Sequence, residues 1–309
     1  AAACVNGPYQ QECSLQILEE VISNYPVDGV FFNMFGYQTR DYSGRYVGIC
    51  QCESCRKRFA LYSGGMELPT QENEEDPVYR KYQEFRKFTT QDLLDPETAV
   101  CTYSSRHVDL VRSESNSAVD RPLPFWAMES ESNVSFVQET FNNRFSSNCV
   151  INAVDIFYRF MGVSPYLNEL RLYGDMAAGG NLDWCIIGGF ETYPDKMNFE
   201  GTKRVFRFHK KYEDIFSSLQ PCGEILLVNP AGDGEDARKE YLGIYKMLKE
   251  AHLPFEVMDG RETELLAEKA DAYRVIILPG IKALPIKAAQ ALEKSGAVII
   301  GTGLALEKD

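Results

Sequence analysis

The 309-residue sequence lacks any uninterrupted apolar stretch of the roughly 18 residues that a membrane-spanning helix requires. Its first residues, AAACVNGPYQ, also lack the basic start and the apolar run of a secretory signal peptide. These two absences predict no membrane partner. The sequence begins and ends beside apolar segments that resemble strands, so we expect both ends to be cuts through a longer protein.

Basic charge is scarce as well, because 32 Lys and Arg residues face 45 Asp and Glu residues, which gives a net charge of -13. Nucleic-acid binding depends on Lys and Arg, so the sequence predicts no nucleic-acid partner. The three histidines, His107, His209 and His252, lie far apart and form no pattern typical of a triad or a histidine-rich metal site.

Cysteine is the informative residue type. Cys50, Cys52 and Cys55 occur together in ICQCESC, and Cys4 lies one supersecondary unit upstream. Four thiolates with this spacing are typical of a closed tetrahedral zinc site, and ordinary thiols or two disulfides are the alternatives. The nine cysteines are odd in number, which favours a reducing compartment and therefore the cytoplasm. We expect structural zinc as the cofactor.

Apolar runs alternate with amphipathic segments along the whole chain, which predicts an α/β fold with parallel sheets. In the first 219 residues the expected strands are 27–37, 97–103, 108–115, 123–130 and 182–190, and the expected helices are 14–24, 53–65, 78–95, 153–161, 171–180 and 199–219. From 220 to 309 the pattern is that of a compact flavodoxin-like α/β domain. Its expected strands are 224–230, 255–259, 273–280 and 297–303, with helices near 236–251, 262–269 and 284–295.

The ends of the expected strands supply the candidate site residues, because parallel α/β barrels place their chemistry there. Glycoside hydrolysis needs two carboxyl groups that flank one cleft, and Glu129 directly follows an apolar run. Single exposed glutamates are common on surfaces, which is the alternative explanation. Hydrogen bonds to sugar hydroxyls are expected from Asn33, Tyr37 and Arg112, unless these only orient loops, and ring stacking from Trp184.

Four segments occur in the order CVNGPYQQE, VDGVFFNMFGY, CQCESCRKRF and LPFWAMES. Together they resemble the second half of a family 42 glycoside hydrolase, the β-galactosidase type, or one of its relatives. The resemblance implies an incomplete (β/α)8 barrel of the TIM type that lacks its first three strands. It also implies structural zinc on Cys4, Cys50, Cys52 and Cys55, and a nucleophile in the pair Met128-Glu129.

The resemblance extends to the downstream part, where the family has a glutamine-amidotransferase-like domain that builds a trimer. Residues 220–309 would be a truncated form of it. Amidotransferases of this class need a cysteine at a strand-to-helix elbow, and the only cysteine here, Cys222, precedes the first strand. We therefore expect an assembly domain without amidotransferase activity, and a homotrimer.

One position departs from the family. Its acid/base Glu follows Asn at the end of the fourth strand, where this sequence has Asn33-Met34, and methionine cannot donate a proton. The acid could be Asp41 or Glu114, or the pair could be placed differently, since fucosidase-like barrels have Asp where Asn33 stands. We predict a retaining glycoside hydrolase with Glu129 as nucleophile and Glu114 as acid. The alternative is a non-catalytic carbohydrate-binding or assembly protein.

Overall fold

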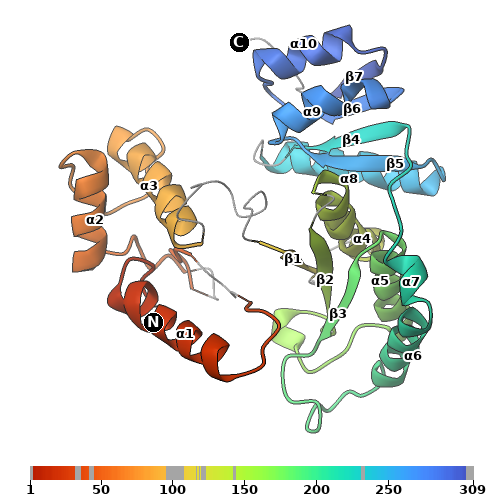
Figure 1. Ribbon diagram of the computed structural model, residues 1–309, viewed down its shortest axis with the longest axis horizontal. Coiled ribbons are helices and arrows are strands. Elements are labelled where there is room, and N and C mark those ends of the chain that lie inside the picture. Colours follow the sequence, from red (N-terminus) through yellow and green to blue (C-terminus); the bar gives the residue numbers. More distant parts are fainter. Residues whose placement is uncertain are drawn as a thin grey trace. The chain divides into compact units, whose positions relative to one another are not determined.

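The computed structural model describes residues 3–31, 36–41, 45–94, 108–115, 117, 119, 123–141, 144–230 and 234–303. The chain divides into two compact units, Ala1–His107 and Val108–Asp309. The described part of unit 1 contains a short π-helix, η1 (Tyr9–Cys13), and three α-helices, α1 (Ser14–Asn24), α2 (Glu53–Ser63) and α3 (Pro77–Leu94) (Figure 1). The three helices lie where the apolar spacing predicts them.

The core of unit 1 is aromatic. Phe59 of α2 packs edge-on against Phe85 of α3, with ring centroids 5.3 Å apart, and both side chains are fully buried. Tyr82, one helical turn before Phe85, joins the same cluster, and Cys50 and Cys52 pack at its margin. The fold of unit 1 therefore brings the cysteine-containing segment against the aromatic faces of α2 and α3.

The strand expected at 27–37 is absent from the positions that the structure describes. Val30 and Phe31 are exposed, and the described part of unit 1 contains helices and a single isolated bridge between Arg40 and Tyr46. A buried parallel strand needs hydrogen-bonded neighbours, and no described segment of unit 1 supplies one. Asn33, Met34 and the expected strand 97–103 lie outside the described residues.

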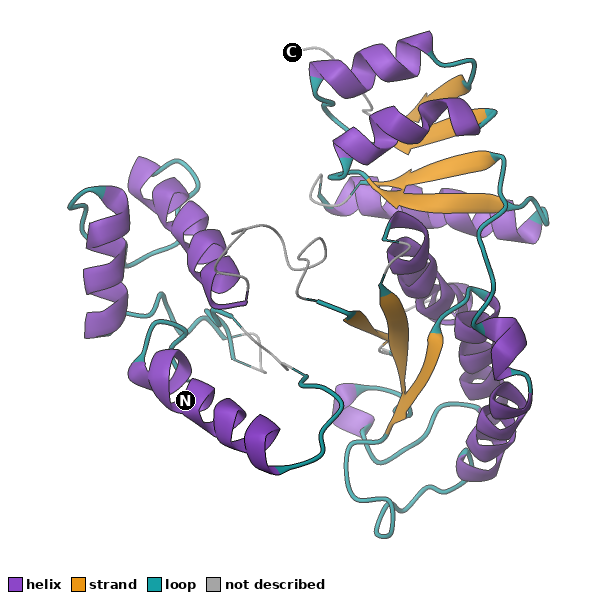
Figure 2. Ribbon diagram, in the orientation of Figure 1, coloured by secondary structure: helices purple, strands orange, loops and turns teal. Residues whose placement is uncertain are grey.

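Unit 2 begins with a parallel three-stranded sheet, β1 (Leu110–Ser115), β2 (Phe145–Ile151) and β3 (Asn181–Cys185), in the order β1-β2-β3 (Figure 2). Helix α4 (Leu123–Thr140) connects β1 to β2, and α5 (Pro165–Ala177), which follows the 3-10 turn η2 (Ile156–Tyr158), connects β2 to β3. Two further helices, α6 (Phe199–Lys211) and α7 (Glu213–Phe216), follow β3. Each helical crossover returns the chain to a parallel neighbour, as βαβ units do.

The strand predicted at 123–130 is wrong, because this segment forms the first two turns of α4. A short apolar run is ambiguous between a strand and a buried helix, and here the helical spacing continues to Thr140. Pro124 is tolerated in the first turn, where no intrahelical donor is lost. The helix expected at 153–161 is also wrong apart from η2.

The second sheet of unit 2 has four parallel strands in the order β5-β4-β6-β7: β4 (Ile225–Asn229), β5 (Phe255–Asp259), β6 (Val275–Pro279) and β7 (Val298–Thr302). Helix α8 (Glu235–Glu250) packs on one face, and α9 (Thr263–Lys269), η3 (Ala270–Ala272) and α10 (Ile286–Lys294) pack on the other. The four strands and the three helices predicted for residues 220–309 are all confirmed.

The architecture is therefore α/β with parallel sheets, as predicted. A closed eight-stranded barrel is not among the described elements, and the amidotransferase-like character of the second sheet stays a prediction. The boundary predicted at 219/220 falls between α7 and β4 and also stays a prediction. None of the helices in the described ranges combines the length and the apolar character needed to cross a bilayer.

Candidate functional site

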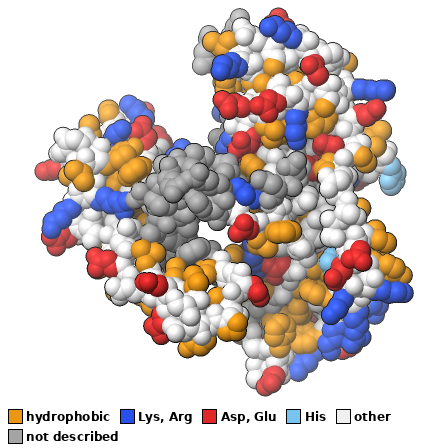
Figure 3. All heavy atoms as spheres, in the orientation of Figure 1, with side chains coloured by type: hydrophobic (Ala, Val, Ile, Leu, Met, Phe, Trp, Pro, Cys, Tyr) orange, Lys and Arg blue, Asp and Glu red, His pale blue; other side chains and the backbone are white. Residues whose placement is uncertain are grey.

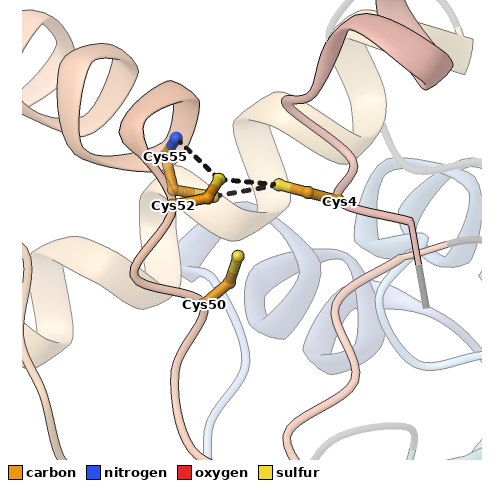
Figure 4. Close-up of side chains that lie close together, drawn as sticks. All are labelled: Cys4, Cys50, Cys52 and Cys55. Atoms are coloured by element: carbon orange, nitrogen blue, oxygen red, sulfur yellow. Dashed lines mark hydrogen bonds between the residues drawn. The ribbon is translucent and has the colours of Figure 1, made fainter. Parts of the chain in front are cut away.

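The four predicted metal ligands come together in unit 1. Cys52 caps the N-terminus of α2, and its Sγ accepts a hydrogen bond of 3.4 Å from the backbone N–H of Cys55. Cys50 lies in the loop just before, and Cys4 approaches from the N-terminal segment (Figure 4). The four Sγ atoms all lie within 4.8 Å of one another.

This geometry fits a tetrahedral metal ion. Zn–S bonds of about 2.3 Å place neighbouring sulfurs about 3.8 Å apart. The Sγ of Cys4 lies 3.2 Å from that of Cys55 and 3.5 Å from that of Cys52. Four soft ligands at this spacing suit zinc or another thiophilic ion and leave no open position for water. The cluster is a candidate metal centre.

The thiols of the cluster differ in their electrostatics. Burial raises the pKa of Cys4 to about 11 and raises the pKa of Cys55 further. Burial also acts upward on Cys52, but hydrogen bonds from the Cys55 N–H and the neighbouring thiols outweigh it and lower the pKa of Cys52. A divalent cation binds thiolates rather than thiols, so its binding here would release protons from the cluster.

Tyr37, a predicted substrate ligand, lies beside these cysteines. Its hydroxyl is 2.6 Å from the amide of Asn6 and 2.6 Å from Thr89 Oγ1, and its ring meets those of Tyr82 and Phe85. Burial raises the pKa of Tyr37 to about 12. The hydroxyl is therefore already engaged in support of the cysteine cluster, and sugar binding by Tyr37 stays a prediction. Asn33 lies outside the described residues.

A second polar cluster lies on one face of the β1-β2-β3 sheet. Arg112 Nη1 donates to Glu114 Oε1 at 2.9 Å, and Arg112 Nε donates to Asp183 Oδ2. The strand register places Glu114 opposite Cys149, and Cys149 opposite Asp183, so all share this face. Burial acts downward on the pKa of Arg112, but its two carboxylate partners outweigh burial and raise it. We call this set the Arg112 cluster.

Asp183 was not among the predicted site residues. It lies inside β3, in the stretch LDWCII, where all the other residues are apolar. A charged side chain in a half-buried apolar strand calls for a partner, and that signal was present in the sequence. The partner itself, Arg112, is 71 residues away and could not be inferred from it.

Glu129 lies in α4, which covers the other face of the sheet. Ser130 Oγ accepts a hydrogen bond of 2.7 Å from Asn148, whose side chain alternates with that of Cys149 and so points away from the Arg112 cluster. Glu129 itself forms an ion pair of 3.3 Å with Arg238 of α8. The sheet therefore separates Glu129 from Glu114, and the strand end that made Glu129 a candidate is absent. Its catalytic role stays a prediction.

Trp184 also lies on the helix side of the sheet. Its indole N–H donates to Asn168 Oδ1 at 2.7 Å, and its ring meets Phe199 edge-on at 5.4 Å and stacks with Phe190 at 6.1 Å. A hollow of about 340 Å³ opens here, lined by Trp184, Phe190, Phe199, Thr202, Lys203 and Phe206. Stacking of a sugar on Trp184 stays a prediction, and it would occur away from the Arg112 cluster.

Helix α6, beside this hollow, concentrates positive charge in an acidic protein. Lys and Arg side chains gather on the surface over α6, at the lower right of Figure 3. The exposed basic residues of this helix are Lys203, Arg204, Arg207, Lys210 and Lys211. Arg204 is paired with Glu169 at 2.6 Å. The net charge of -13 is therefore unevenly distributed over the surface.

No family model and no curated protein matches the sequence. Among solved structures, the chain is similar to α-L-fucosidase isoenzyme 2 from Paenibacillus thiaminolyticus, with a TM-score of 0.63 and 15% sequence identity. The fold of the chain resembles that of part of this fucosidase. The match covers 98% of this chain and 46% of the fucosidase, so the chain spans less than half of that protein's length. Family 42 is not confirmed and stays a prediction.

Proposed function

We propose that the chain belongs to a glycoside hydrolase and that the face carrying the Arg112 cluster forms part of its sugar site. The observation that carries this proposal is the position of Glu114 and Asp183 on the same face of a parallel sheet, joined by Arg112. Glycoside cleavage uses a pair of carboxyl groups that flank the scissile bond. The likeness to a fucosidase fold supports the same class of reaction.

Glu114 is the proposed nucleophile. It lies next to the last residue of β1, and 45% of its side chain is exposed, so an anomeric carbon can reach its carboxylate. Arg112 holds one of its oxygens in place at 2.9 Å, which suits a carboxylate that attacks better than a group that must deliver a proton. This assignment reverses the role of acid that the sequence suggested for Glu114.

The proton donor must then be another residue. In a retaining enzyme it lies about 5 Å from the nucleophile, and in an inverting enzyme the separation is about 6.5–9.5 Å. Glu191 is an exposed carboxyl in the loop that follows β3, at the same end of the parallel sheet as Glu114. We propose Glu191 as the first donor to test.

The proposed substrate is a glycoside, and two sugars are the first to test. The fucosidase neighbour favours an α-L-fucoside, and the resemblance to family 42 favours a β-galactoside. A panel of chromogenic aryl glycosides that includes both, assayed with the full chain, tests the proposal. We expect hydrolysis of at least one substrate, and a loss of about 10³-fold or more in kcat for Glu114→Gln, because the group that forms the covalent bond is removed.

Glu129→Gln is the matched control, because Glu129 is a glutamate of the same unit on the opposite side of the sheet. If Glu129 acts only in its ion pair with Arg238, this variant retains activity. Loss of activity in Glu129→Gln together with full activity in Glu114→Gln would refute our assignment and favour the nucleophile that the family resemblance implies.

A non-catalytic carbohydrate-binding or assembly protein is the second candidate. Met34 favours it, because a thioether stands where the resembling family has its acid/base Glu. Under this hypothesis no glycoside of the panel is hydrolysed, yet calorimetric titration with fucose or galactose gives a dissociation constant that Glu114→Gln weakens. Absence of both hydrolysis and binding would contradict both candidates.

We further propose that the cysteine cluster binds one structural zinc ion, held by Cys4, Cys50, Cys52 and Cys55. Metal analysis of the purified chain, with one zinc expected per chain, tests this. The trimer implied by the family resemblance is a separate proposal. Light scattering behind a sizing column tests it, and a monomer at micromolar concentration would contradict it.

A further inference from the structure

We propose that Asn6 is a positioning residue of the cysteine cluster, whose side-chain amide holds Cys55 Sγ in place for metal binding. This inference rests on the metal-binding part of the proposed function. Asn6 Nδ2 donates to Cys55 Sγ at 3.3 Å, and the contact is buried. Asn6 is 7% exposed and comes two residues after Cys4, so the segment that supplies one ligand also supports another.

The orientation of the Asn6 amide is fixed by chemistry. Arg58 Nη1 lies 3.1 Å from Asn6 Oδ1, and a guanidinium can only donate, so the oxygen of the amide must face Arg58. The NH₂ group is then directed to the other side, where it meets both Cys55 Sγ and the hydroxyl of Tyr37 at 2.6 Å. Arg58 is one turn after Cys55 on the same helix, so α2 itself sets the direction of the donor.

The support continues through Tyr37. Its hydroxyl lies 2.6 Å from Thr89 Oγ1, which in turn donates to the Phe85 carbonyl of α3 at 2.9 Å. A chain of buried and partly buried hydrogen bonds therefore runs from α3 to the sulfur of Cys55. A residue that donates directly to a ligand atom orients it and reduces the negative charge on it, and its loss typically costs about 10–100-fold in metal affinity. In this chain of contacts only Asn6 donates to the sulfur.

The test uses the full chain with Co(II) and Zn(II) as probes. Asn6→Asp keeps an oxygen for Arg58 and the size of the side chain, but it removes the donor to Cys55. We expect the Zn(II) dissociation constant, measured by competition with a chromophoric chelator, to rise about 10–100-fold. The sulfur-to-cobalt charge-transfer band should also shift, because the sulfur loses its hydrogen bond.

Thr89→Val is the control, since it removes a buried hydrogen bond two steps from the sulfur and leaves the Asn6 amide in place. Its metal affinity should fall by less than that of Asn6→Asp, and its cobalt band should match that of the unmodified chain, because the donor to the sulfur remains. An equal loss of affinity in Thr89→Val and Asn6→Asp would show a general loss of stability and would overturn the specific role of Asn6. An unchanged affinity in Asn6→Asp would overturn it as well.

If Asn6→Asp fails to fold without metal, the variant can be refolded with Co(II) and the release of cobalt into excess EDTA measured. Release at least ten-fold faster than from the unmodified chain is expected, and equal rates refute the role of Asn6. An unmodified chain that binds no cobalt refutes the metal centre itself. If the unmodified chain binds cobalt and Asn6→Asp binds it with equal affinity, only the inference about Asn6 is refuted.

Discussion

A carboxyl oxygen of Glu139, near the end of α4, accepts a hydrogen bond from the backbone N–H of Val257 in β5. One residue later, Thr140 Oγ1 accepts from the N–H of Asp259 at 3.0 Å. Strand β5 is the edge of its sheet, so its outward N–H groups would otherwise lack a strand partner. A helix that packs on the first sheet thus covers the edge of the second sheet, which joins the two parts of unit 2.

This contact makes the stability of unit 2 depend on pH. Burial raises the pKa of Glu139 from its ordinary value of 4.5 to about 8, with Glu256 acting in the same direction, whereas the Val257 N–H and Lys249 act against it. Between these two values the folded state binds a proton that the unfolded state has released. Stability therefore falls as pH rises through this window.

Glu139→Gln should abolish this contribution, because the amide keeps an oxygen for Val257 and never ionises. We expect the variant to be more stable than the unmodified chain at pH 8 and similar to it near pH 5, as measured by urea midpoints. Burial also raises the pKa of Asp175 to about 8. The stability of Glu139→Gln should therefore still fall as pH rises, but less steeply than that of the unmodified chain. A pH slope in Glu139→Gln as steep as that of the unmodified chain would contradict the prediction.

The Arg112 cluster gives a second prediction. Arg112→Met leaves Glu114 and Asp183 facing each other without their shared cation, on a face where only 25% of the Asp183 side chain is exposed. We expect a loss of about 2–4 kcal/mol in the free energy of unfolding, because a partly buried charge loses its partner. Adding Asp183→Asn should recover part of this loss, since the amide no longer needs the cation.

The measurement is a double-mutant cycle by urea unfolding with Arg112→Met, Asp183→Asn and the combined variant. The expected coupling energy between the two positions is about 0.5–3 kcal/mol. If the two single losses simply add, the ion pair between Arg112 and Asp183 does not contribute to stability and the cluster is only a proximity of charges.

The second sheet was predictable because its strands are short, mostly apolar runs with helices between them. Residues such as Leu226, Val228 and Ile276 are completely buried, so the local pattern and the final environment agree. The spacing of Cys50, Cys52 and Cys55 likewise identified the cluster, since three ligands from one short loop leave a local signature. Both features can be recognised without knowledge of distant contacts.

Strand β2 shows why other parts escaped prediction. It reads FSSNCVI, and its polar residues Ser146, Ser147 and Asn148 suggest a loop, yet all three are buried. Asn148 is satisfied by Ser130 of α4 and Ser115 of β1, which lie 18 and 33 residues away. A buried polar strand depends on such partners, and the sequence does not reveal which distant residues will become neighbours.

Metal removal gives the third prediction. The cysteine cluster joins the N-terminal segment to α2 and borders the aromatic core of Phe59, Tyr82 and Phe85. An ion bound only by the folded state stabilises it by about 4 kcal/mol when present at 1,000 times its dissociation constant. We therefore expect EDTA, or Cys52→Ser, to lower the thermal midpoint of unit 1 and to release one zinc ion per chain.

Cys13→Ser is the matched control, because Cys13 is exposed and outside the cluster. It should keep both the metal and the midpoint. Full metal content in Cys52→Ser, or an equal loss in Cys13→Ser, would contradict a metal centre built by these four cysteines.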